Sequence, residues 1–158
     1  MQVLPPVRAR HTYTQTLVAP PDEVFPLLCP VREAEWVEGW DPRVVFTASG
    51  VAEQGCAWVM PGAGTADPIW VVTHHDPAAH RVSFVKTTPD HSVGLIDIAL
   101  APAPGGGTYA EITYDYTALS DEGRRFVQSF TAEHYAGFMK EWEDSLNGFL
   151  RAAAAGSR

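Results

Sequence analysis

The sequence predicts an α+β domain: a seven-stranded antiparallel sheet, two short helices between strands 1 and 2, and a long C-terminal helix. Two patterns carry this prediction. Between residues 43 and 117, short apolar runs alternate with turn residues at roughly ten-residue spacing. After Ser120 there is no proline, and the apolar residues follow a helical period. We expect one domain over residues 1–158, with an arm at 1–8 and a frayed tail at 152–158.

The N-terminal third predicts one strand and two short helical segments. Residues 10–18 are rich in β-branched and aromatic side chains, which favour a strand. Pro21 suits the first turn of a helix, where its missing N–H is not needed, and Pro30 marks the end of that helix. A second short helical segment is expected at 31–36. The apolar side of the first helix consists of Val24, Phe25, Leu27 and Leu28.

The middle of the chain predicts an antiparallel meander. The connections between its strands are too short for the helical crossovers that parallel strands need. Gly105, Gly106 and Gly107 lie between two strand patterns, so they indicate a hairpin turn and not a phosphate-binding loop. The six predicted strands are 43–48, 56–60, 68–75, 81–87, 91–100 and 108–117.

The C-terminal segment predicts a single helix of about thirty residues that ends near Leu150. Ser120 is a suitable N-cap, and Asp121 and Glu122 follow in the first turn, where the helix dipole favours negative charge. At 100° per residue the larger side chains share one arc. They are Val127, Thr131, Tyr135, Phe138, Met139, Trp142, Leu146 and Phe149.

Composition excludes several classes of function. Hydrophobic residues make up 46% of the chain and charged residues 19%, an ordinary globular balance. The net charge of −8 argues against a nucleic-acid partner and against an anionic membrane surface. No apolar stretch is long enough to insert into a membrane, and no signal peptide is visible, so we expect a cytoplasmic protein. Cys29 and Cys56 are expected to be buried free thiols.

The order of these elements resembles that of the START-like (SRPBCC) helix-grip superfamily, which includes the major birch pollen allergen, polyketide cyclases and lipid-transfer domains. Residues 16–25 resemble the family's first strand turning into its first helix. Residues 106–108 resemble the approach to its last strand, and residues 29–33, with Trp36 and Trp40, resemble an uncharacterised bacterial subgroup. The resemblance implies that the curved sheet wraps around the C-terminal helix and encloses an apolar cavity.

Aromatic side chains are the candidates for the lining of that cavity. Such residues supply apolar area, and tyrosine and tryptophan add one polar group each. Pockets for small molecules have this composition. The alternative is that the same residues only fill the core. The candidates are Trp36, Trp40, Trp58, Trp70, Tyr135, Phe138 and Trp142.

Few polar residues suggest chemistry. His134 lies at the edge of the helical arc and could exchange protons with a ligand. Asp97 interrupts an apolar strand and is a second candidate acid or base, whereas Glu111 and Asp115 are expected to face solvent. Arg32 and Glu33 could pair at the mouth of the cavity. The histidine spacing matches no metal-binding motif, so we expect neither a metal nor a cofactor.

Three functions follow from this sequence as alternatives. The first is a carrier or sensor that binds a small hydrophobic molecule, such as an aromatic compound or a lipid, without reacting with it. The second is an enzyme of the polyketide cyclase or dehydratase kind that uses the same cavity. The third is a protein-interaction module that uses the outer face of the sheet. The sequence leaves open whether the protein is a monomer or a homodimer.

Overall fold

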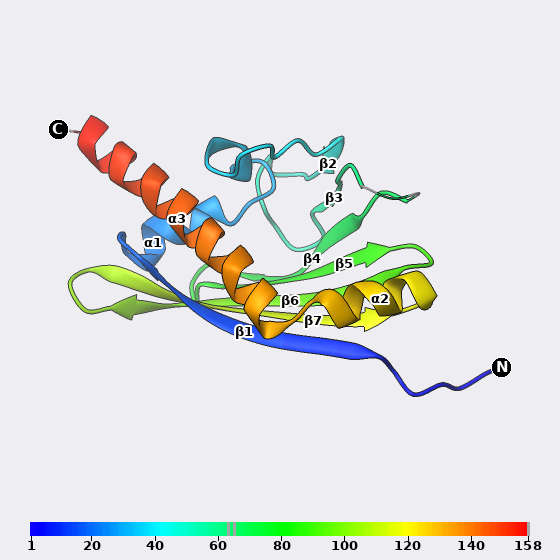
Figure 1. The fold of residues 1–158 in the computed structure, drawn as a ribbon. Helices are drawn as coiled ribbons and strands as arrows, with labels where there is room; N and C mark the ends of the chain where they lie inside the picture. Colours follow the sequence, from blue (N-terminus) through cyan, green and yellow to red (C-terminus); the bar gives the residue numbers. More distant parts are fainter. Residues whose placement is uncertain (63, 65, 158) are drawn as a thin grey trace.

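Seven antiparallel strands form one sheet in this computed structural model, which describes residues 1–62, 64 and 66–157 (Figure 1). The order in the sheet is β1-β7-β6-β5-β4-β3-β2, so all neighbours except β1 and β7 are consecutive in the chain. The predicted meander is confirmed. The strands are β1 (Arg8–Leu17), β2 (Val44–Phe46), β3 (Ala57–Val59), β4 (Ile69–Asp76), β5 (Arg81–Thr88), β6 (Ser92–Ala103) and β7 (Gly107–Ala118).

Two short helical segments connect β1 to β2, as predicted. The first begins with α1 (Pro21–Val24) and continues as a 3₁₀ turn, η1 (Phe25–Leu27). The second is the 3₁₀ turn η2 (Glu33–Glu35). Pro21 occupies the first helical turn, where a missing N–H leaves no hydrogen bond unmade.

The alternation of side chains along β7 gives the sheet an inner and an outer face. Ile112, Tyr114 and Tyr116 are buried on the concave face, whereas Glu111 is exposed on the outer face. The predicted orientation of this strand is therefore confirmed. The turn from β6 to β7 is a tight hairpin in which Gly105 and Gly106 both adopt positive φ, a conformation that favours glycine.

The C-terminal helix was predicted as one continuous rod, and this prediction is wrong. The structure contains α2 (Asp121–Ser129) and α3 (Ala132–Gly156), separated at Phe130 and Thr131. Phe130 is buried with a non-helical backbone, and the Thr131 side chain accepts a hydrogen bond from the His134 N–H (3.2 Å) as the N-cap of α3. Ser120 caps α2, as predicted. Within the described residues, no helix is both long and apolar enough to cross a membrane.

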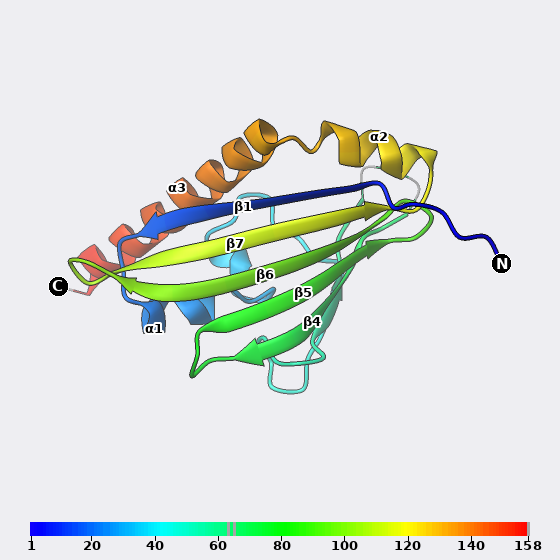
Figure 2. The same cartoon turned by 90° about the horizontal axis from the view of Figure 1, so that it is seen from below.

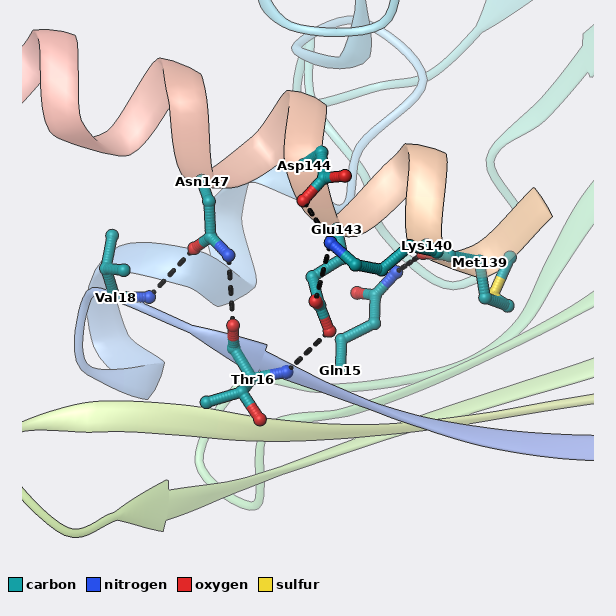
Figure 3. Close-up of polar contacts among 8 residues, drawn as sticks. All are labelled: Gln15, Thr16, Val18, Met139, Lys140, Glu143, Asp144 and Asn147. Carbon is teal, nitrogen blue, oxygen red and sulfur yellow. Dashed lines mark hydrogen bonds and ion pairs between the residues drawn. The ribbon is translucent and has the colours of Figure 1, made fainter. Parts of the chain in front are cut away.

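Helix α3 lies along the free edge of β1, which is the first strand of the sheet (Figure 2). The Thr16 N–H donates to Glu143 Oε2 (2.8 Å), and the Val18 N–H donates to Asn147 Oδ1 (2.9 Å) (Figure 3). The Asn147 amide in turn donates to the Thr16 carbonyl oxygen (3.0 Å). Gln15, which is buried, donates to the Met139 carbonyl oxygen (2.9 Å). The helix therefore satisfies backbone groups of an edge strand that would otherwise be open to pairing with another chain.

Candidate functional site

A cavity of about 300 Å³ lies between the concave face of the sheet, the η2 segment and the two C-terminal helices. Most of the side chains that line it are aromatic. They come from β3, β4, β5 and β7 on the sheet side and from α2 and α3 on the helix side. The aromatic lining residues are Trp40, Trp58, Trp70, Phe84, Tyr114, Tyr116, Phe126, Phe130, Phe138 and Trp142.

Strand register brings five positions into one row across the sheet wall of the cavity. Trp58 is paired with Trp70, Trp70 with Lys86, Lys86 with Gly94, and Gly94 with Tyr116. Directly paired residues of antiparallel strands point to the same face, so the side chains in this row all face the concave side. The two indole rings stack with centroids 5.5 Å apart and an interplanar angle of 11°.

The helix wall is a stripe of residues at four-residue spacing. It consists of Phe130, His134, Phe138 and Trp142, which lie on one side of the chain from the end of α2 to the middle of α3. Phe138 is 40% exposed, which places it at the rim of the cavity. The stripe shares Phe138 and Trp142 with the predicted arc. Tyr135, Met139 and Leu146, which also belong to that arc, are buried and do not line the cavity.

Five of the predicted lining residues do line the cavity. Four of them, Trp58, Trp70, Phe138 and Trp142, belong to the walls described above. The fifth, Trp40, lies after η2, and its indole N–H donates to the Pro30 carbonyl oxygen (2.7 Å).

The other two predicted residues lie behind the lining. The Trp36 indole N–H donates to the Leu27 carbonyl oxygen (3.1 Å), and its ring packs against Trp142 at 5.2 Å. The Tyr135 hydroxyl donates to the Ile112 carbonyl oxygen (2.5 Å). Both residues are buried, so they support the cavity walls and do not form them.

The two candidate catalytic residues lie in different parts of the structure. His134 lines the cavity at its rim and is itself exposed to solvent. Asp97 is exposed on the outer face of β6, where it accepts a hydrogen bond from Ser83 Oγ (2.6 Å). The structure therefore places Asp97 outside the cavity. Neighbouring positions of a strand point to opposite faces, and the apolar Ile96 and Ile98 on either side of Asp97 take the inner face.

Glu33 is a cavity residue that the sequence reasoning assigned to the wrong environment. Its expected partner, Arg32, instead binds Glu35 with two hydrogen bonds (2.9 and 3.1 Å). Glu33 is only 8% exposed and lines the cavity, and its carboxyl makes no hydrogen bond with a described residue. Burial raises the pKa of this carboxyl from 4.5 to about 8, so it is protonated at neutral pH. The spacing could have indicated this, because Trp36 lies one 3₁₀ turn further along the same side.

Lys86 is the second polar residue that was missed. Its ammonium donates to the Tyr116 hydroxyl (3.4 Å) and lies 5.3 Å from the centre of the Trp70 ring and 5.7 Å from the centre of the Tyr116 ring. Burial lowers the pKa of Lys86, because the cavity solvates a charge less well than water does. Alternation could have located it, since Lys86 shares a strand face with Phe84 and Val82.

The chemistry available in the cavity is that of hydrogen bonding and proton exchange. Burial raises the pKa of Tyr114 and Tyr116, so both remain neutral phenols. Across residues 1–62, 64 and 66–157, no three histidine, cysteine, aspartate or glutamate side chains meet in a way that could hold a metal ion. Cys29 and Cys56 are buried free thiols, as predicted.

Comparison with known proteins shows the fold and leaves the family open. No protein-family model matches the sequence, and no curated protein matches it. An uncharacterized protein from Rhizobium leguminosarum has a similar structure, with 18% identity, a TM-score of 0.65, and coverage of 94% of this chain and 97% of that one.

Two further structures have names that describe a biosynthetic role. Norcoclaurine synthase from Thalictrum flavum, in complex with dopamine and hydroxybenzaldehyde, has 11% identity and a TM-score of 0.68, over 93% of this chain and 88% of that one. DynU16, from the dynemicin biosynthetic locus, has 16% identity and a TM-score of 0.58, over 94% of this chain and 49% of that one. The chain therefore has the helix-grip fold of these proteins, as its sequence predicts.

Proposed function

We propose that the protein binds a small apolar or aromatic molecule inside the cavity and acts as a carrier or sensor for it. The observation that carries this proposal is an aromatic-lined space of about 300 Å³ between the sheet and the C-terminal helices. Well-packed protein interiors contain few voids larger than a water molecule, so a space of this size is unusual for a core. The shared fold of ligand-holding proteins such as norcoclaurine synthase is consistent with it.

The volume limits the size of the ligand. An apolar cavity of about 150 Å³ holds benzene, so a cavity of twice that volume accommodates a body of about two fused rings. Such a body has about 200 Å² of surface, comparable to a tryptophan side chain. At about 25 cal/mol per Å², its burial contributes about 5 kcal/mol before ordering costs. A free energy of about 5 kcal/mol corresponds to a dissociation constant of about 0.2 mM, so we expect a simple two-ring compound to bind with a dissociation constant of about 0.1 to 1 mM.

A matched pair of variants on one strand tests the proposal. Ile96→Phe adds a ring inside the cavity, whereas Leu95→Phe adds the same ring on the outer face, where Leu95 is exposed. We expect Ile96→Phe to weaken the binding of 2-naphthamide, measured by calorimetry, by about tenfold or more, and Leu95→Phe to leave it unchanged. Equal binding by both variants would contradict the cavity as the binding site. Native mass spectrometry of protein from its own host would identify a co-purifying molecule.

The second candidate function is that of an enzyme resembling polyketide cyclases or dehydratases. One observation favours it: Glu33 presents a protonated carboxyl to the cavity, and His134 stands at the rim. A carboxyl with a pKa of about 8 can exchange protons near neutral pH, which cyclisation and dehydration require. This function predicts turnover of a polyketide-like substrate with a bell-shaped pH profile that is lost in Glu33→Gln or His134→Ala. A substrate that binds and is recovered unchanged would favour the carrier.

A further inference from the structure

Two tryptophans and one lysine in the sheet wall of the cavity hold donors with few or no acceptors. The indole Nε1 atoms of Trp58 and Trp70 are buried and have no hydrogen-bond partner among the described residues. Lys86 lies in the same cross-strand row, and its ammonium reaches one neutral oxygen, the Tyr116 hydroxyl. An ammonium has three N–H donors, so two of those of Lys86 have no acceptor among the described residues.

The Lys86 ammonium also lacks a counter-charge. In the described part of the chain it forms no ion pair, whereas the other lysine, Lys140, contacts both Glu143 and Asp144 on the surface. The acidic group of the cavity, Glu33, makes no ion pair or hydrogen bond with Lys86 among these residues, and it is uncharged at neutral pH. The ring faces of Trp70 and Tyr116 replace only part of the solvation of the ammonium, since a ring face carries no net charge.

The aromatic walls and the unpaired cation together define a class of ligand. We propose that the cavity binds an organic acid whose apolar or aromatic body fills the space and whose carboxylate pairs with the Lys86 ammonium. This inference rests on the proposed function of the cavity. A carboxylate suits the site better than a neutral carbonyl does, because a charge-assisted hydrogen bond is about twice as strong as a neutral one and supplies the missing counter-charge.

A pair of probes of nearly equal shape tests this inference. 2-Naphthoate carries a carboxylate, and 2-naphthamide is its uncharged counterpart. At neutral pH we expect the wild-type protein to bind the acid about tenfold to a hundredfold more tightly than the amide, measured by isothermal titration calorimetry. Equal affinities for the two probes would overturn the inference and leave the proposed function standing. Failure of both probes to bind would overturn the two together.

Variants of the two lysines identify the responsible charge. Lys86→Met keeps an unbranched side chain and removes the ammonium, whereas Lys140→Met removes the same charge from the surface. We expect Lys86→Met to lose the preference for the acid over the amide, and Lys140→Met to retain this preference. If a folded Lys86→Met variant still prefers the acid, a group other than Lys86 binds the carboxylate, and the inference is wrong. If Lys86→Met does not fold, the comparison of acid and amide on wild-type protein still decides.

Discussion

Replacing Glu33 with glutamine should stabilise the protein at alkaline pH and change its stability little at acidic pH. Glu33 is buried in the cavity, and its pKa of about 8 in the folded state exceeds the 4.5 of an unfolded chain. Between these two values the native state binds more protons than the unfolded state does. The free energy of unfolding therefore decreases as pH rises from about 4.5 to about 8. Glutamine is nearly isosteric with glutamic acid and has no proton to lose.

The size of the effect follows from the pKa difference. One pKa unit corresponds to about 1.4 kcal/mol, so the shift from 4.5 to about 8 corresponds to about 5 kcal/mol. Part of the interval between the two pKa values lies below pH 5.5. Between pH 5.5 and 8.5, the difference in unfolding free energy between the variant and the wild type should therefore grow by about 3 kcal/mol. Water that enters the open side of the cavity reduces this figure, so about 2 kcal/mol is the smallest change that fits the burial of Glu33.

Urea unfolding of the wild type and Glu33→Gln at a series of pH values measures this difference. Glu35→Gln is the matched control from the same turn, because the hydrogen bonds from Arg32 lower the pKa of Glu35 and place its titration below this pH range. Above pH 5.5, the unfolding free energy of the control should therefore change with pH in the same way as that of the wild type. If the unfolding free energy of Glu33→Gln has the same pH dependence as that of the wild type, Glu33 is solvated and ionised in the folded protein, and its burial does not raise its pKa.

Five further substitutions test other parts of the structure. Gly123→Ala should cost about 3 kcal/mol of unfolding free energy or more, because its Cβ would lie 1.7 Å from a backbone oxygen, whereas Gly137→Ala, in open space, should gain about 0.5 to 1 kcal/mol. Asn147→Ala should cost about 1 to 3 kcal/mol and accelerate amide exchange at the end of β1. Gly94→Ala should lower both stability and affinity, since its Cβ would meet a cavity tyrosine at 2.6 Å. Trp142→Ala should weaken 2-naphthamide binding in calorimetry and leave the protein folded.

The sheet could be predicted because its signals are local. In β7, alternation alone assigned Ile112 and Tyr114 to the core and Glu111 to solvent, and the structure agrees. The break in the C-terminal helix could not be predicted in this way, because Thr131 lies on the same arc as its neighbours. Thr131 ends the first helix because its side chain caps the next one. The helical periodicity of apolar residues does not reveal such a cap.

The two polar groups of the cavity, Glu33 and Lys86, were missed for different reasons. Glu33 follows a basic residue, which suggested a surface ion pair, but Arg32 turns to Glu35 and leaves Glu33 on the buried side of η2. Alternation could have placed Lys86 on the inner face. Its position between Trp70 and Tyr116 depends on strand register, which this sequence does not specify.

The cavity remains open because both ends of the helical wall are fixed to the sheet. At one end, Phe126 and Phe130 pack against Tyr116 of β7 with ring centroids 5.0 and 4.9 Å away. At the other end, α3 is held along β1 by the hydrogen bonds of Glu143 and Asn147. The stripe between these anchors, which includes His134, Phe138 and Trp142, cannot move onto the tryptophan wall without breaking one of them. The space is therefore present before a ligand arrives, and binding needs little ordering of the chain, which favours affinity.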